Sequence, residues 1–232
     1  MKKAVLLFCS AMVMSGFAQV KPDEMSVVRA ILDSAGRSDV TVESVCKTDK
    51  EGRIIFLDLT NKDMEKGGIK SIPGGIGRLT ALKELHLARN EVTALPSELG
   101  ALSGLTTLDL QYNQIAELPA ELGKLHSLVE LDLRNNQLSQ LPKALFSLNH
   151  LRVLKLSNNN FKSIPEETGR LASLRELYLS SNNLKTVPGS VIRMKSLTYV
   201  DFQDNKFCAA SAELSAWLKK WDKSWKSKQQ CK

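Results

Sequence analysis

Apolar residues recur along this chain with a period of 23 residues, and certain polar and proline positions keep the same period. Leucine or valine forms one column, at Leu85, Leu108, Leu131, Leu154, Leu177 and Val200. Proline forms a second column that holds six of the seven prolines, at Pro73, Pro96, Pro119, Pro142, Pro165 and Pro188. A fixed period of about 20 to 50 residues predicts a solenoid of stacked repeats.

Each period contains an alternating segment such as "LDL", in which Leu108 and Leu110 are predicted to point inward and Asp109 outward. The alternation predicts one short strand per repeat, and stacking would place these strands side by side in a parallel sheet. The proline that follows has no N–H to donate and ends regular pairing. The next segment, "ELGxLxxL", is predicted to fold back as a loose helical turn on the outer side.

Asparagine forms a third column, directly after each predicted strand. A side-chain amide in a turn can bond backbone groups that the strand leaves unpaired. We therefore interpret this column as a structural ladder, made by Asn90, Asn113, Asn136, Asn159, Asn182 and Asn205.

These motifs carry a family resemblance. "LxxLxLxxN", as in 82–90 and 128–136, is similar to the leucine-rich repeat. "LPxELGxLxxL", as in 95–105 and 118–128, resembles its 23-residue class, found in Ras-suppressor-like and many bacterial secreted proteins. The resemblance covers residues 53–207, about seven repeats. It implies an α/β solenoid, a leucine-rich repeat horseshoe with a parallel concave sheet.

The first repeat departs from the period. Leu59 to Pro73 spans 14 positions, whereas Leu87 to Pro96 spans 9, so 14 − 9 leaves five extra residues in "NKDMEKGGIK". We predict a protruding loop there.

A solenoid exposes apolar surface at both ends and therefore needs caps. At the front, in residues 19–52, "DEMSVVRAILDSAG" has helical spacing, with Met25, Val28, Ile31 and Leu32 on one face. "VTVESVC" (40–46) and "GRIIFLDL" (52–59) are strand-like and could pair. The segment resembles the N-terminal cap of plant receptor-type repeats, but it lacks their tryptophan and second cysteine.

At the back, residues 208–232 are similar to a cysteine-bearing C-terminal cap. Leu214, Trp217, Leu218, Trp221 and Trp225 are spaced to line one helical face. One interpretation is that this face covers the last repeat, and the other is that the cationic helix binds a membrane or a cell-wall polyanion. Both could hold, with Trp225 expected to protrude.

Residues 1–18 have the pattern of a cleaved signal peptide: two lysines, an apolar run, and small residues before a cut near Ala18. The alternative is a membrane anchor, but the run of about 15 residues is short of the roughly 20 that a span needs. The chain is therefore expected to be secreted or periplasmic, with no transmembrane span after cleavage.

Net charge does not point to nucleic acid. The formal charge of +7 falls to +5 when Lys2 and Lys3 leave with the leader. Residues 209–232 hold six lysines against Glu213 and Asp222, which is +4 of that total. The repeats are nearly neutral, and nucleic-acid binding would need a basic face on them.

Three cysteines remain after cleavage. Cys208 and Cys231 flank one segment, and in an exported protein we expect them to form a disulfide. Cys46 is then the odd one, and a buried, inert thiol is favoured over a reactive one.

No pattern points to catalysis, a cofactor or a metal. His126 and His150 fall on outer turns and His86 on a strand, without metal-ligand spacing. The recurring glycines 77, 100, 123 and 169 ease a tight bend and lack the Lys-Ser/Thr of a phosphate loop. Asp109 and Asp132 are predicted to be adjacent but solvated, which does not favour acid–base catalysis.

A concave binding surface is what remains. Seven strands at about 4.8 Å spacing give a sheet roughly 29 Å wide, enough for about 800 Å² of contact with a partner. Tyrosine and arginine on that face are typical interface anchors. The candidate ligand-binding residues are His86, Arg89, Asp109, Gln111, Tyr112, Asp132, Arg134, Lys155, Tyr178 and Tyr199.

Two functions are compatible with these features. The first is an exported, monomeric protein that binds another protein through its concave sheet. The alternative is a surface-associated protein that binds a membrane or a cell-wall polyanion through the basic tryptophan- and lysine-containing helix. An enzyme subunit or ligase-like effector would need a further domain, which we do not expect after Lys232.

Overall fold

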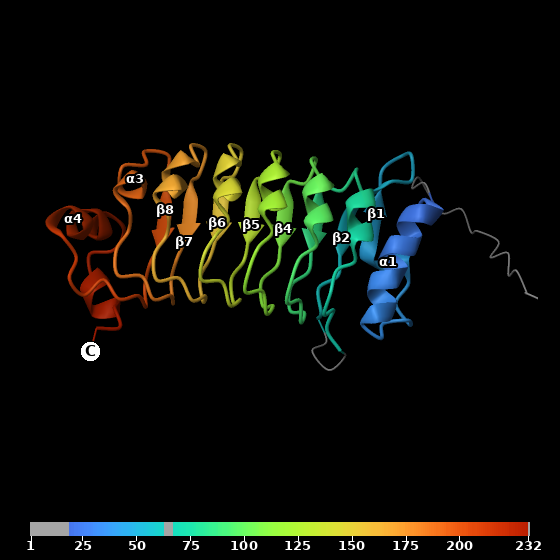
Figure 1. The fold of residues 1–232 in the computed structure, drawn as a ribbon, viewed down its shortest axis with the longest axis horizontal. Coiled ribbons are helices and arrows are strands. Elements are labelled where there is room, and N and C mark those ends of the chain that lie inside the picture. Colours follow the sequence, from blue (N-terminus) through green and yellow to red (C-terminus); the bar gives the residue numbers. More distant parts are fainter. Residues whose placement is uncertain (1–18, 63–66, 232) are drawn as a thin grey trace, which may run out of the picture.

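The computed structural model describes residues 19–62 and 67–231. It is an open solenoid with strands along one side and short helical turns along the other (Figure 1). The expected leader, residues 1–18, and residues 63–66 of the expected loop lie outside the described residues.

The strands form one eight-stranded sheet in the order of the sequence. Neighbouring strands from β2 to β8 are parallel and in register, so that Leu85 pairs with Leu108 and Leu108 with Leu131. The predicted fold class, a leucine-rich repeat solenoid, is confirmed. The eight strands are β1 (Cys46–Thr48), β2 (Ile54–Asp58), β3 (Glu84–His86), β4 (Thr107–Asp109), β5 (Glu130–Asp132), β6 (Val153–Lys155), β7 (Glu176–Tyr178) and β8 (Tyr199–Asp201).

The outer side of each repeat is a short helix that follows the column proline. Five are 3-10 helices and the last is α-helical: η1 (Gly74–Arg78), η2 (Ser97–Ala101), η3 (Ala120–Lys124), η4 (Lys143–Ser147), η5 (Glu166–Arg170) and α3 (Gly189–Ile192). Between these turns and the sheet lies one continuous leucine-rich core, in which Leu85, Leu108 and Leu131 are fully buried.

The glycine column has a different cause from the one expected. A Cβ added at Gly100 would lie 2.5 Å from the carbonyl oxygen of Glu121 in the next repeat, and one at Gly77 would lie 2.7 Å from that of Glu98. Neither glycine has the positive φ that a special bend would need. Close approach between neighbouring repeats therefore excludes a side chain at these positions.

The asparagine column joins neighbouring repeats. Asn113 donates from Nδ2 to the carbonyl oxygens of Leu87 and Leu110, and its Oδ1 accepts from the N–H of Val92. The same pattern recurs from Asn90 to Asn205. In the first repeat, Asn90 Oδ1 accepts a hydrogen bond from the N–H of buried Ile69. The end of the expected loop is therefore bonded to the asparagine ladder.

The N-terminal end is covered by helix α1 (Pro22–Ser34), whose Val28, Ile31 and Leu32 are fully buried. The strand expected over 40–46 was partly wrong, because Val42–Val45 forms a short helix, α2, and only β1 pairs with β2, antiparallel. Val42 is buried, and packing of this turn against α1 outweighs the strand preference of its valines.

The C-terminal end is covered by α4 (Ala212–Trp221) and the 3-10 helix η6 (Trp225–Lys228). The expectation that Trp225 protrudes was wrong: it is only 2% exposed. The chain turns back after Trp221, and a disulfide joins Cys208 to Cys231, which holds η6 against the last repeat. Across 19–62 and 67–231 we find no helix with the length and apolarity to cross a membrane.

Candidate functional site

In each strand from β2 to β8, three residues pair with the neighbouring strand. The first and third of these three point outward onto the concave face. Contacts between neighbouring side chains run across this face from β2 to β8. We call the following set the concave network: Phe56, Glu84, His86, Asp109, Gln111, Glu130, Asp132, Arg134, Lys155, Glu176, Tyr178 and Tyr199.

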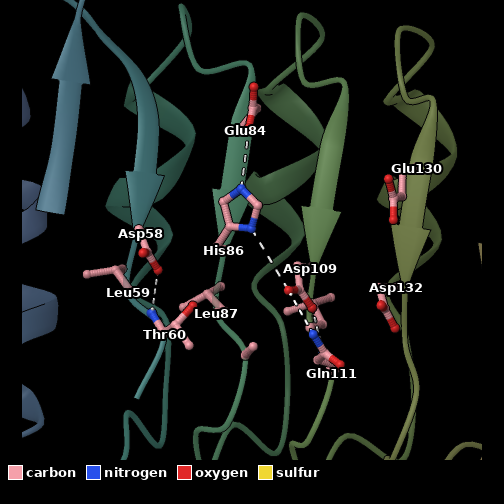
Figure 2. Close-up of polar contacts among 12 residues, drawn as sticks. Asp58, Leu59, Thr60, Glu84, His86, Leu87, Asp109, Gln111, Glu130 and Asp132 are labelled. Atoms are coloured by element: carbon pink, nitrogen blue, oxygen red, sulfur yellow. Dashed lines mark hydrogen bonds and ion pairs between the residues drawn. The ribbon is translucent and has the colours of Figure 1, made fainter. Parts of the chain in front are cut away.

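At the N-terminal side, the imidazole of His86 lies between two carboxylates (Figure 2). Its Nε2 is 3.4 Å from Glu84 and its Nδ1 is 3.9 Å from Asp109, while its ring lies 5.3 Å from that of Phe56. The interaction with Asp109, followed by that with Glu84, raises the pKa of His86 despite its partial burial. Positive charge on His86 is therefore favoured in the folded protein.

Asp109 is the acidic partner of that histidine on β4. Burial alone would raise the pKa of its carboxyl, but the contact with His86 and hydrogen bonds from Gln111 outweigh burial and lower it. Asp109 thus stays ionised and holds both neighbours in place.

The centre of the face differs from the solvated carboxylates that we expected. Asp109 and Asp132 are adjacent, as predicted, but Asp132 is only 3% exposed. Arg134 contacts it at 2.7 Å and Lys155 at 3.7 Å. A buried carboxylate needs such compensation, and the two cations supply it.

Arg134 also links two repeats. Its Nη2 donates to Gln111 Oε1 at 3.1 Å, and the Asp132 carboxylate holds its guanidinium and raises its pKa. Lys155 bonds Glu130 as well as contacting Asp132.

At the C-terminal side the network becomes aromatic. Tyr178 and Tyr199 have ring centroids 5.0 Å apart, and Lys155 Nζ lies 6.0 Å above the Tyr178 ring. Tyr178 donates its hydroxyl to Glu176, and burial together with this bond raises its pKa to about 12. The phenol therefore stays neutral and serves as a hydrogen-bonded aromatic surface.

Arg89 and Tyr112 form a second group at the ends of β3 and β4, in the turns before the asparagine ladder. The guanidinium of Arg89 lies 5.4 Å from the centre of the Tyr112 ring. Both residues have a positive φ, 59° and 55°. Repeats further along place Asn135, Asn158 and Asp204 in this conformation, which such side chains tolerate better.

The structure thus places eight of the ten candidate residues in the concave network and the other two in the stacked Arg89–Tyr112 pair. Phe56 was missed, because the five extra residues of the first repeat shift its place in the period; pairing with Glu84 reveals it. Glu84, Glu130 and Glu176 were also absent from the candidate set, although the period places them at equivalent positions.

The two remaining histidines and Cys46 lie outside the concave network. The region that the structure describes contains no group of three or more His, Cys, Asp or Glu suited to a metal ion. His126 and His150 are exposed on outer turns, where His150 bonds the backbone of His126. Cys46 is unpaired and half-buried, and burial raises its thiol pKa to about 11, which disfavours a nucleophilic thiolate.

The comparisons with known proteins concern the same repeats. The family "Leucine rich repeat" matches residues 126–184 and 149–207, and the family "Leucine-rich repeat region" matches residues 56–148. Among curated proteins, none matches the chain.

Two solved structures are similar. A leucine-rich repeat protein of Leptospira interrogans is 36% identical over 60% of this chain, with a TM-score of 0.57. A plant ice-binding protein is 23% identical over 81% of this chain, with a TM-score of 0.68, and shows the fold alone. The chain spans 36% of the length of the first and 65% of the second. The matched families, the in-register sheet and the asparagine ladder together place this chain among the leucine-rich repeat proteins.

Proposed function

We propose that this chain is an exported protein that binds another protein through its concave sheet. Leucine-rich repeat proteins generally mediate protein–protein interaction and are typically not enzymes. The chain would act as a monomer, without cofactor, metal or catalysis, and without nucleic acid as a partner. The leader predicted from residues 1–18, with a cut near Ala18, supports export to the periplasm or the medium.

One observation carries the proposal: Tyr112 and Tyr199 are 49% and 46% exposed, and within the described residues they are the exposed large hydrophobic side chains. Tyrosine is enriched among residues that dominate binding energy, since its ring offers area and its hydroxyl a hydrogen bond. Tyr199 lies at the C-terminal end of the network on β8, and Tyr112 follows β4 beside the network, so the two rings widen the surface that a partner could contact.

The backbone of Tyr112 adds to this support. A bulky residue in the left-handed region costs on the order of 1 kcal/mol, and glycine, asparagine or aspartate would cost less there. The presence of a tyrosine at a backbone position that disfavours it supports a role for the Tyr112 side chain in contacting a partner.

The ordering of the network also supports binding. Association costs about 0.5–1.5 kcal/mol for each flexible side chain that must be immobilised. Arg134 and Lys155 are already held by Asp132, so a partner would meet side chains that are largely fixed.

A pull-down from the envelope and medium of the source organism would test the proposal. The baits are the mature chain, the pair Tyr112→Ala with Tyr199→Ala, and a control pair, Lys124→Ala with Lys143→Ala, on the outer turns. A protein retained in high salt by the first and third baits and lost from the second supports concave binding. Equal capture by all three would refute it. Arg134 and Lys155 are left intact, because removing them would leave Asp132 buried without compensation.

The second candidate is a surface-associated protein that binds a membrane or a cell-wall polyanion. It rests on Lys219, Lys220, Lys223 and Lys226, all exposed around α4 and η6. Trp217 and Trp225 are buried and Trp221 is partly buried, so this mode rests mainly on the lysines, which makes it sensitive to salt. If every bait captures anionic material and high salt releases that material, the result favours this second candidate.

A further inference from the structure

A cleft opens where the last repeat meets the C-terminal cap. Its volume is about 720 Å³, and it is lined by Lys185, Lys206, Cys208, Ala209 and Gln230. Clefts of roughly 300–1,000 Å³ are typical of small-molecule sites.

The repeat and the disulfide together create this cleft. Lys206 N–H donates to Leu184 at 2.8 Å, as in earlier repeats, but the chain then leaves the period and enters the cap. The disulfide brings the chain end back, and the Gln230 N–H donates to Asn205 at 2.7 Å. Two lysines from successive repeats therefore face a segment from the end of the chain.

The charge of the lining has one sign. Among the residues that the structure describes, no acidic side chain lines the cleft, and neither Lys185 nor Lys206 forms an ion pair. Two ammonium groups beside an amide side chain are suited to a phosphate or carboxylate group.

A smaller cavity of about 290 Å³ shares Cys208 and Ala209 with the cleft and is also lined by Trp225, Lys226 and Gln229. Trp225 Nε1, a donor, and Gln229 Oε1, an acceptor, are buried and have no hydrogen-bond partner among the residues described. A sugar hydroxyl both donates and accepts, which is the chemistry that these two atoms need.

We propose that the junction between the last repeat and the cap binds an anionic sugar. Its phosphate or carboxylate contacts Lys185 and Lys206, and its hydroxyl-bearing body lies against Ala209 and the disulfide, towards Trp225 and Gln229. This site is separate from the concave face, so Tyr112→Ala with Tyr199→Ala should leave sugar binding unchanged.

Calorimetric titration of the purified full chain at low ionic strength tests the site. The probes are glucose 6-phosphate, glucuronate, glucose and inorganic phosphate. We expect one of the two anionic sugars to bind more tightly than inorganic phosphate and glucose not to bind measurably. If neither anionic sugar binds, the proposal is wrong.

Variants assign the contacts. Lys185→Met and Lys206→Met should each raise the Kd about fivefold, as expected for loss of one solvated ion pair. Lys162 occupies the position equivalent to Lys185 one repeat earlier, and Lys162→Met should not change the Kd. Gln229→Leu should weaken binding of the anionic sugar and leave binding of inorganic phosphate unchanged. If Lys185→Met and Lys206→Met bind the sugar like the unmodified chain and have unchanged melting curves, the assignment is wrong. It is also wrong if Lys162→Met loses as much affinity as they do.

Discussion

Asn113 donates a hydrogen bond of 2.9 Å from its Nδ2 to the carbonyl oxygen of Leu87, 26 residues earlier and in the preceding repeat. The same side chain accepts from Val92 N–H at 3.0 Å. One buried amide therefore satisfies backbone groups of its own repeat and of its neighbour.

Replacing Asn113 with alanine should lower the free energy of unfolding by about 3 kcal/mol, because several buried backbone groups would lose their partners. Urea denaturation measures the loss. The matched control is Asn160→Ala: Asn160 is exposed and donates one bond of 3.3 Å to Gln137, so its loss should stay within about 0.5 kcal/mol. Equal losses would contradict a ladder role for Asn113.

Gly100→Ala should destabilise the protein by about 1–3 kcal/mol, since the new methyl group would collide with backbone of the next repeat. Gly104 is the control, because a Cβ there would meet the flexible end of Lys83. Gly104→Ala should change the thermal midpoint little. If both substitutions behave alike, close packing is not the reason for the glycine column.

Stability should depend on pH through His86. Its folded-state pKa is raised above 6.5, so its contribution to stability is fully present below pH 6.5 and is lost as pH rises through the raised value. His86→Gln should flatten that part of the stability curve. An NMR titration measures the pKa directly, and Asp109→Asn should lower it. A pKa of His86 at or below 6.5 would contradict the predicted interaction.

Trp225→Ala should cost about 3–5 kcal/mol, as for other fully buried aromatic side chains. Denaturation measured by circular dichroism gives the value. Lys226→Ala, the exposed neighbour, serves as the control and should change stability little. A loss of stability at Trp225 as small as that at Lys226 would contradict the burial of the Trp225 side chain.

Periodicity alone was enough to predict most of the architecture. Leu108 can pair with Leu131 because identical spacing keeps each strand in register with the next. The position of each ladder asparagine follows from the same register. These features depend on contacts that recur at fixed sequence separations in every repeat, and the period of 23 residues makes those separations visible in the sequence.

The candidate surface was predictable in its location but not in its interactions. The period placed His86, Asp109 and Tyr178 on one face. It did not reveal that Asp132 would be buried between Arg134 and Lys155, since this depends on how two long side chains fold back onto the sheet. Phe56 was hidden by the irregular first repeat.

The sequence by itself therefore determined the solenoid, its sheet and its repeated hydrogen bonds, because strand pairs 23 positions apart and ladder bonds at fixed separations recur in every repeat. Only the tertiary structure decided the helix at Val42–Val45, the burial of Trp225 and the cationic cleft beside Cys208. These features lie at the two ends of the solenoid, where no further repeat follows. There the packing of non-repeating segments, rather than the period, decides which side chains meet.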